Sequence, residues 1–258
     1  MHGFLTRDGI PPSDFLTLAR QELAPYESVE LRRTEVVHAA CLNDGFEVVC
    51  RDGARFTGHT LLLATGVVDE LPAIEGLREL YGTSIHHCPY CDGWEWRDQP
   101  IAVYGRGEAG GGLALALKQW SRDVVLCTDG PGKIAAKMRR GLSREQIDIR
   151  EDKILRLEGH NGFLERIVFA SGDPLPRRAL FFSSGQHQRS PLPEQLGCRF
   201  TKKGAVATGQ REATNVPGLY VAGDASKDVQ FVIVAAAEGA EAAVAINKAL
   251  LQRDLLLR

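Results

Sequence analysis

The sequence predicts an α/β protein with a Rossmann-like domain, and three observations support this class. The apolar segment 101–104 runs directly into a glycine-rich turn and then into a helical segment over 109–120. A second apolar segment, 124–127, follows that helix and completes a strand–helix–strand unit. The uniformly apolar stretch 61–63 is typical of a strand buried on both faces of a sheet. At 258 residues, the chain is long enough for two domains.

Apolar periodicity and turn residues divide the rest of the chain into short elements. Ser13 is a candidate N-cap for the first helix, and Asn43-Asp44-Gly45 favours a tight turn between two strands. The elements expected before the central unit are a helix over 13–23, a strand over 29–31, strands over 36–42 and 46–51, and a strand over 55–63. Those expected after it are a helix over 133–142, strands over 147–150, 153–157, 164–169 and 179–183, and a terminal helix over 232–256.

Composition and charge argue against several classes of function. The net charge is -2 and no long basic run is present, so neither a nucleic-acid nor an anionic-membrane partner is indicated. The apolar run 232–237 is far too short to span a bilayer, and the first residues lack the apolar core of a signal peptide. Of the six cysteines, one pair alone has a motif spacing, which is unlike a disulfide-stapled secreted domain and favours a reducing cytoplasm.

The glycine-rich turn has the spacing Gly105-x-Gly107-x-x-Gly110. In a dinucleotide-binding turn the first glycine permits the tight bend and the second lets the backbone approach a pyrophosphate. The third allows close helix–strand packing. The phosphates then lie at a helix N-terminus, where free N–H groups and the helix dipole favour negative charge. We interpret the turn as a dinucleotide site, with a purely structural glycine turn as the alternative.

The end of the second strand predicts which coenzyme the turn binds. Asp129 lies 19 residues after Gly110, close to the spacing expected for a carboxylate that binds the adenosine ribose 2′-OH. No arginine follows the strand to pair with a 2′-phosphate, which favours NADH over NADPH. The alternative is that Asp129 merely opens a turn before Gly130.

Cys88-Pro89-Tyr90-Cys91 lies about ten residues before the nucleotide-binding strand and can close a small, reducible disulfide. The thiolate is the reactive form of cysteine, and neighbouring cations or dipoles lower its pKa. His86 and His87 are candidates for that role, and Asp92 can carry a proton to or from a leaving thiolate. A dithiol beside a nucleotide turn indicates electron transfer between a nicotinamide and a pair of thiols.

Three other interpretations of the cysteine pair remain open. Zinc needs four ligands, and the adjacent histidines are too close in sequence to complete good tetrahedral geometry, so no metal site is predicted. A glutaredoxin-like domain also carries Cys-Pro-Tyr-Cys, but near the start of a thioredoxin-type fold. The pair can also be two inert buried cysteines.

These segments resemble the thioredoxin reductases, flavoproteins of the pyridine nucleotide–disulfide oxidoreductase group. The redox segment and nicotinamide turn of that family are similar to 88–105 here, and 61–66 resembles the strand that closes the first part of its FAD domain. Residues 214–224 resemble the second FAD motif, whose aspartate is Asp224 here. Residues 230–250 resemble the terminal helix that directs its N-terminus at the flavin.

The resemblance implies two Rossmann-like domains of the three-layer ββα type, one inserted into the other. The FAD-binding domain would comprise 1–83 and 204–258, the NAD(P)-binding domain 84–203, with hinges near Gly82 and Gly204. FAD would contact the following residues: Thr65, Gly66, Gly223, Asp224 and Gln230.

In the family's mechanism, NAD(P)H reduces FAD and FAD reduces the disulfide. A domain rotation then exposes the dithiol to a thioredoxin-like protein or a small disulfide. By position, Cys91 would face the flavin and Cys88 would attack the substrate. The resemblance also implies a homodimer.

The chain departs from the family pattern in two places. The arginines that bind the 2′-phosphate in typical members are absent after Leu126. The family also begins with an FAD glycine-rich βαβ unit that has no counterpart near residue 13 or before it. We therefore expect a misassigned start or a truncated gene product, and a 258-residue chain that binds FAD weakly or not at all.

Two functions compete with a disulfide reductase. One is a flavin-dependent dithiol oxidase of the same family, which closes a small-molecule dithiol and passes electrons to oxygen. The other is a non-catalytic nucleotide-binding remnant. Asp92 beside the dithiol favours the reductase, and the sequence does not name the substrate.

Overall fold

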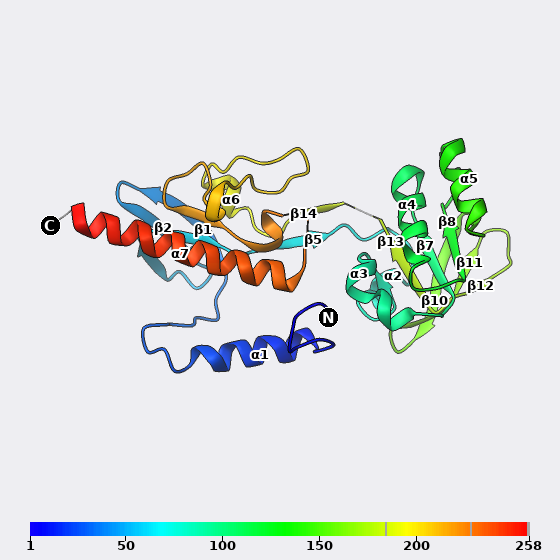
Figure 1. Ribbon diagram of the computed structural model, residues 1–258, viewed down its shortest axis with the longest axis horizontal. Coiled ribbons are helices and arrows are strands. Elements are labelled where there is room, and N and C mark those ends of the chain that lie inside the picture. The colour runs from blue at the N-terminus through cyan, green and yellow to red at the C-terminus, as the bar shows by residue number, and fades with distance from the viewer. Residues whose placement is uncertain (184, 228, 257–258) are drawn as a thin grey trace. The chain divides into compact units, whose positions relative to one another are not determined.

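The computed structural model describes residues 1–183, 185–227 and 229–256, and the chain forms two compact units (Figure 1). The split unit contains Met1, Gly3–Val68 and Gln186–Arg258, and the inserted unit contains His2 and Asp69–Gly185. One unit is therefore inserted into the other, as the resemblance implies. The boundaries at 68/69 and 185/186 replace the expected ones at 83/84 and 203/204.

Both boundaries lie earlier than expected because packing and strand pairing decide to which unit the intervening residues belong. The short helix α2 (Leu77–Leu80) packs into a core of the inserted unit. The strand β5 (Val67–Asp69) pairs with β14 (Gln186–Gln188), so the two connections run side by side. The expected hinge glycines, Gly82 and Gly204, instead form turns with positive φ within the units.

The inserted unit is built on a five-stranded parallel sheet, which contains the predicted strand–helix–strand unit around the glycine turn. In spatial order its strands are β6 (Ile85–His86), β13 (Ala179–Phe182), β7 (Ile101–Tyr104), β8 (Val124–Cys127) and β9 (Asp148–Arg150).

Side chains on the two faces of this sheet pack against different layers. Ile101, Val103 and Leu126 share a core with α4 (Gly107–Leu117) and α5 (Ala136–Arg144). The alternate positions, among them Ala102 and Val125, share a second core with an antiparallel sheet. Both faces are buried, which explains why the three central strands β13, β7 and β8 are almost entirely apolar. The layers are therefore ββα, as predicted. The antiparallel sheet contains β10 (Ile154–His160), β11 (Phe163–Phe169) and β12 (Leu175–Pro176).

The split unit combines an antiparallel sheet with a short parallel one. The antiparallel strands are β1 (Val36–Leu42), β2 (Gly45–Cys50) and β3 (Arg55–Gly58), which include the predicted hairpin. The parallel pair is β4 (Leu61–Leu63) and β15 (Leu219–Val221). The strand expected over 55–63 is therefore two strands, because the chain leaves the antiparallel sheet after Gly58 and joins β15.

Two smaller expectations are wrong. The strand expected over 29–31 is exposed, irregular chain, because no neighbouring strand pairs with it in the described residues. The first helix, α1 (Pro12–Leu23), begins before Ser13 and has Pro11 at its N-cap. Proline at the first helical position has a φ that suits a helix start, so no Ser13 cap is needed. The remaining elements are α3 (Pro89–Asp92), η1 (Gly93–Trp96), α6 (Leu192–Gln195), η2 (Gln210–Glu212), η3 (Gly223–Ala225) and α7 (Val232–Leu256).

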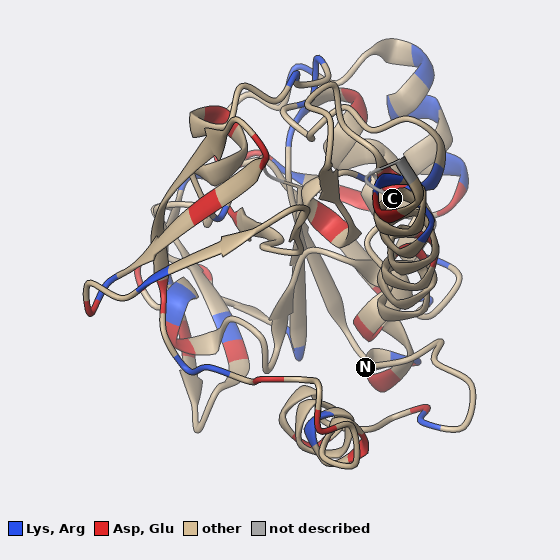
Figure 2. Ribbon diagram, turned by 90° about the vertical axis from the view of Figure 1, so that its left-hand side faces the viewer, with Lys and Arg blue, Asp and Glu red and all other residues tan. Residues whose placement is uncertain are grey.

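Charged residues are distributed along the whole chain. Figure 2 shows acidic and basic positions interspersed, in keeping with the net charge of -2. Within the described residues, each helix is too short or too polar to cross a membrane.

Candidate active site

The parallel strands bring the dithiol and the glycine turn to one edge of the inserted unit's sheet. β6 leads directly into His87 and Cys88, β7 leads into Gly105, and β8 leads into Thr128 and Asp129. This edge holds the carboxyl ends of the strands, which is where open α/β sheets bind ligands. Only β13 separates β6 from β7, so their ends lie about 10 Å apart at the usual strand spacing.

Cys88 and Cys91 form a disulfide with a Cα–Cα distance of 5.4 Å. Cys88 is the N-cap of the single helical turn α3, and Pro89 occupies its first position. One helical turn places residues three apart on the same side, which brings the two thiols together. Tyr90 between them is exposed. The structure therefore pairs the two cysteines that the sequence singled out.

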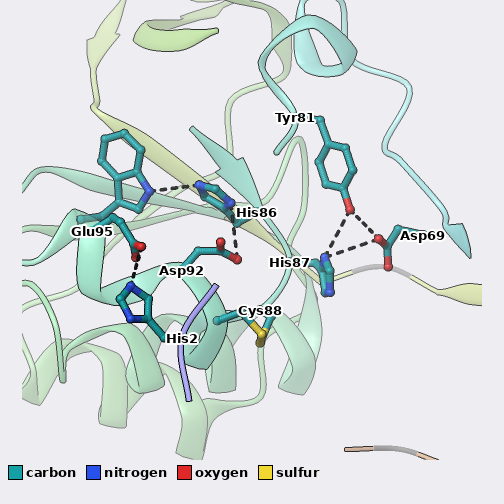
Figure 3. Close-up of polar contacts among 10 residues, drawn as sticks. His2, Asp69, Tyr81, His86, His87, Cys88, Asp92 and Glu95 are labelled. Atoms are coloured by element: carbon teal, nitrogen blue, oxygen red, sulfur yellow. Dashed lines mark hydrogen bonds and ion pairs between the residues drawn. A yellow bond between two sulfur atoms is a disulfide. The ribbon is translucent and has the colours of Figure 1, made fainter. Parts of the chain in front are cut away.

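Asp92 belongs to a group of polar contacts that the sequence revealed only in part. Trp96 donates its Nε1–H to His86 Nε2 at 3.0 Å, and His86 Nδ1 lies 3.5 Å from Asp92 Oδ2 (Figure 3). Because Nε2 accepts a hydrogen bond, a neutral imidazole carries its proton on Nδ1, facing the carboxylate. His86 is buried and packs against Phe181. Trp96 and His86 thus orient the carboxyl group next to the dithiol.

Burial shifts both titrating groups of this set toward their neutral forms. It lowers the pKa of His86, although the charge of Asp92 opposes that shift. It also raises the pKa of Asp92, against the influence of His86. A carboxyl group with a raised pKa exchanges protons closer to neutral pH, which suits a proton donor to a thiolate.

His87 belongs to a second group on the other side of the dithiol segment. Tyr81 donates its hydroxyl hydrogen to Asp69 Oδ2, and His87 Nδ1 lies 3.5 Å from the same carboxylate oxygen (Figure 3). Burial, reinforced by the hydrogen bond to Asp69, raises the pKa of Tyr81. Tyr81 therefore stays protonated at neutral pH. The adjacent histidines thus face different carboxylates, and the sequence did not indicate either Tyr81 or Asp69.

The glycine turn has the close contacts that a dinucleotide turn requires. A Cβ on Gly110 would lie 2.4 Å from the carbonyl carbon of Gly105, and a Cβ on Gly105 would lie 2.8 Å from Gly110 Cα. Gly107 has φ +58 and starts α4. Gly105 and Gly110 therefore approach each other more closely than a side chain would allow, and Gly107 has a positive φ that favours glycine. This is the geometry of a dinucleotide-binding turn.

Asp129 lies beside the glycine turn, but its carboxylate already has protein partners. Its Oδ1 accepts a hydrogen bond from Ile154 N at 2.8 Å, and its Oδ2 lies 3.6 Å from Arg106 Nη2. Arg106, within the glycine turn, also donates from Nε to Thr128 O at 2.7 Å. No arginine follows Leu126 closely in the sequence, but Arg106 reaches the end of β8 from the turn after β7.

The split unit places the predicted FAD residues at the carboxyl ends of its two parallel strands. β4 ends before Thr65 and Gly66, and β15 ends before Gly223 and Asp224. A cavity of about 720 Å³ runs along β4 to Thr65. The Thr65 Oγ1 is buried and has no hydrogen-bond partner among the described residues. A buried hydroxyl without a partner is costly, and a polar group of a ligand would satisfy it.

Residues on α7 and before it support the Asp224 turn. Glu238 Oε2 accepts a hydrogen bond from Gly223 N at 2.7 Å. Lys227 Nζ lies 3.1 Å from Glu212 Oε2 and 3.8 Å from Glu238 Oε1. Gln230 exchanges two hydrogen bonds with Gln186 of β14. Sequence patterns did not predict the Glu212–Lys227–Glu238 group. Its one signal in the sequence is Glu238, an acidic residue in the apolar first part of α7.

Comparison with known proteins agrees with this site. The family described as pyridine nucleotide-disulphide oxidoreductase matches residues 21–239. A "probable thioredoxin reductase" from Arthroderma benhamiae is 28% identical over 260 residues, covering 88% of this chain and 64% of the relative. Thioredoxin reductase aclD of Aspergillus oryzae is 26% identical and covers 95% and 82%.

A solved structure extends the similarity to the fold. The Bacillus anthracis protein assigned as thioredoxin reductase TrxB has a TM-score of 0.92 at 33% identity, covering 98% of this chain and 85% of that one. The chain thus spans less than two thirds of the first relative and over four fifths of the other two. With a family match over most of its length and a dithiol and a glycine turn on one sheet edge, the chain belongs to the pyridine nucleotide-disulphide oxidoreductases and is similar to thioredoxin reductases within them.

Proposed function

We propose that the protein acts as an NAD(P)H-dependent flavin disulfide oxidoreductase of the thioredoxin reductase type. Electrons pass from NAD(P)H through FAD to the Cys88–Cys91 disulfide and on to a thioredoxin-like protein or a small disulfide. The observation that carries this proposal is the placement of the disulfide and the glycine turn on the same edge of one parallel sheet.

The residues present fit NAD(P)H and one part of FAD. Gly105, Gly107 and Gly110 make a turn that only glycine allows, which suits the pyrophosphate of NAD(P)H. The unpartnered hydroxyl of Thr65 and the Asp224 turn suit the polar chain of FAD. When bound, FAD would supply the transfer of two electrons from the hydride of NAD(P)H to the Cys88–Cys91 disulfide, chemistry that no side chain here supplies.

The protein's own residues then exchange disulfides with the substrate. The Cys88 thiolate attacks one sulfur of the substrate disulfide, and the first substrate thiolate leaves. The Cys91 thiolate attacks Cys88 in this mixed disulfide, which reforms Cys88–Cys91 and releases the second thiolate. Asp92 provides a proton to a leaving thiolate, and His86 holds its carboxyl group in place. The substrate disulfide gains two electrons and two protons, which balances the oxidation of the dithiol.

The proposal also covers the coenzyme, the oligomeric state and the location of the protein. NADH is the favoured coenzyme, because the Asp129 carboxylate lies at the strand end that meets the adenosine ribose and would repel a 2′-phosphate. The functional form is a homodimer in the cytoplasm.

Substitution of the two cysteines tests the function. In flavin-loaded protein, Cys88→Ser and Cys91→Ser should abolish NADH-dependent reduction of a disulfide, while reduction of the flavin by NADH persists. Cys41→Ser is the matched control, because Cys41 is an exposed free thiol. Full disulfide turnover in either active-site variant would refute the role of the dithiol. Oxygen consumption with a dithiol substrate, without disulfide reduction by NADH, would instead show a dithiol oxidase.

A further inference from the structure

We propose that Arg106 and Asp129 act together as the determinant of coenzyme choice, with Arg106 as the group that meets the adenosine 2′ position. This inference rests on the proposed use of NAD(P)H. It assigns specificity to a pair of residues from two separate segments, one in the glycine turn and one after β8.

Hydrogen bonds hold Arg106 over the end of β8. Its Nε donates to Thr128 O at 2.7 Å, and its Nη2 donates to Asp129 O. Nη2 also lies 3.6 Å from Asp129 Oδ2. The third nitrogen, Nη1, makes no hydrogen bond to any described residue, and 54% of the side chain is exposed. The guanidinium is therefore fixed at the strand end and still open to a ligand.

The Asp129 carboxylate is also fixed in place. Its Oδ1 accepts a hydrogen bond from Ile154 N, which joins the end of β8 to the start of β10. Asp129 has φ +50, a conformation that restrains its backbone as well. It is thus more than the first residue of a turn. It caps a neighbouring strand and partly neutralises the charge of Arg106.

The opposite charges of Arg106 and Asp129 act differently on the two coenzymes. A ribose 2′-OH can donate to Asp129 Oδ2, whereas a 2′-phosphate needs a cation. Arg106 can make charge-assisted hydrogen bonds with a phosphate, and Asp129 repels it. The pair therefore favours the 2′-OH while Asp129 is charged, and removing that charge should leave Arg106 free to bind a 2′-phosphate.

Lys133 is the other cation at this turn. It lies between β8 and α5, and its carbonyl oxygen is 4.0 Å from a Cβ built on Gly107. No contact ties its side chain to the end of β8 among the described residues. We therefore place the 2′-phosphate on Arg106, and Lys133→Ala serves as the competing variant.

Binding of 5′-AMP and 2′,5′-ADP, which differ only in the 2′-phosphate, tests the inference without any flavin chemistry. Calorimetric or NMR titrations at constant salt would use the full chain and four variants: Arg106→Ala, Arg106→Lys, Asp129→Asn and the Arg106→Ala/Asp129→Asn double variant. The amide introduced by Asp129→Asn keeps an oxygen for Ile154 N, so that this variant loses charge without losing the cap. Arg166→Ala is the control, since Arg166 has similar exposure and pairs with Glu158 on the antiparallel sheet.

We expect Arg106→Ala to weaken 2′,5′-ADP binding by about tenfold or more and to leave 5′-AMP binding within about twofold, as for loss of a charge-assisted contact. Arg106→Lys should fall between, because a lysine cannot form the same fork. Asp129→Asn should strengthen 2′,5′-ADP binding about tenfold, and the double variant should lose that gain.

Three outcomes would overturn the inference. If Lys133→Ala abolishes the binding of 2′,5′-ADP and Arg106→Ala does not, the 2′-phosphate binds to Lys133 and not to Arg106. If Asp129→Asn and its double variant bind 2′,5′-ADP equally, the two residues are not coupled. If the wild-type chain binds neither nucleotide, the proposed nucleotide site itself is wrong and this inference falls with it.

Discussion

The two units of the chain differ in how completely protein partners satisfy the polar groups at their proposed binding sites. In the inserted unit, a five-stranded parallel sheet is buried on both faces, and polar groups at its ligand-binding edge have protein partners: His86 has Trp96, and Asp129 has Ile154. In the split unit, the parallel sheet of the described residues has two strands, and Thr65 leaves a buried hydroxyl unpaired beside a cavity.

This contrast distinguishes two ways of preparing a binding site. The inserted unit preorganises its turn through backbone contacts that a side chain would disrupt, so its geometry does not depend on a ligand. The split unit retains an unsatisfied polar atom that a ligand can pair, so its stability should respond to the ligand. All three tryptophans, Trp94, Trp96 and Trp120, lie in the inserted unit, so their fluorescence reports unfolding of that unit separately.

The largest effect is expected at the glycine turn. Gly110→Ala places a Cβ 2.4 Å from backbone, and we expect it to destabilise the inserted unit by about 3 kcal/mol and to abolish nucleotide binding. Gly112→Ala in the same helix is the control: its Cβ meets nothing within 4 Å, and it should stabilise the helix by about 0.5–1 kcal/mol. Urea unfolding followed by tryptophan fluorescence measures both. Equal behaviour of the two variants would mean that the turn is not preorganised.

The next effect concerns the buried charges of the split unit. Lys227→Met leaves the carboxylates of Glu212 and Glu238 without their cation, which should cost about 2–3 kcal/mol. Burial raises the pKa of Glu238, so its native form binds a proton more readily than its unfolded form. The contribution of Glu238 to stability is therefore lost as pH rises above 4.5, the ordinary pKa of a glutamate. The stability that Lys227→Met loses relative to the wild type should thus be larger at pH 7 than at pH 5.

Hydrogen exchange of β15 amides at the two pH values measures this deficit. Lys248→Met, an exposed lysine of α7, is the control and should change little. A deficit that does not depend on pH would show that Lys227 acts through packing alone.

A somewhat smaller effect is expected at His86. His86→Leu removes the acceptor of the Trp96 indole N–H and the imidazole that lies 3.5 Å from the Asp92 carboxylate, which should cost about 2 kcal/mol. His86→Asn, which can accept from Trp96, should recover part of this loss. Because burial lowers the pKa of His86, the unfolded chain binds a proton more readily than the native protein below pH 6.5.

Wild-type stability should therefore fall as pH drops below 6.5, and this part of the slope should vanish in both variants. Tryptophan fluorescence during urea unfolding from pH 5 to pH 7.5 measures it. An unchanged slope in His86→Leu would contradict the neutral, buried state of His86.

The smallest effect is expected at Thr65, and it has the opposite sign. Thr65→Val replaces an unpaired buried hydroxyl by a methyl group of similar size, so flavin-free protein should gain about 1 kcal/mol in the split unit. The gain should shrink or reverse when FAD is bound. Thr214→Val is the matched control, because the Thr214 hydroxyl bonds Leu219 O at 3.0 Å and its loss should destabilise. Hydrogen exchange of the β4 amides would detect the gain in Thr65→Val and the loss in Thr214→Val. Destabilisation by Thr65→Val would show that the Thr65 hydroxyl already has a partner.

Local sequence alone was sufficient to predict the strand–turn–helix–strand unit, the hairpin of β1 and β2, and the terminal helix. Each depends on interactions within a few residues: apolar runs that bury a strand, glycines that permit a bend, and helix-forming residues in α7. The same spacing signals singled out Cys88 and Cys91, which the structure joins, and pointed to the family that the comparisons show.

Tertiary structure alone decided which segments meet. The order β6-β13-β7-β8 inserts a strand from residues 179–182 between the dithiol and the glycine turn, and no local periodicity encodes that neighbour. The same holds for Arg106 with Asp129 and for the division of 55–63 between two sheets. Sheet order is chosen by the burial of whole faces, a property of the assembled layers, so contacts between distant segments are visible only after the layers have packed.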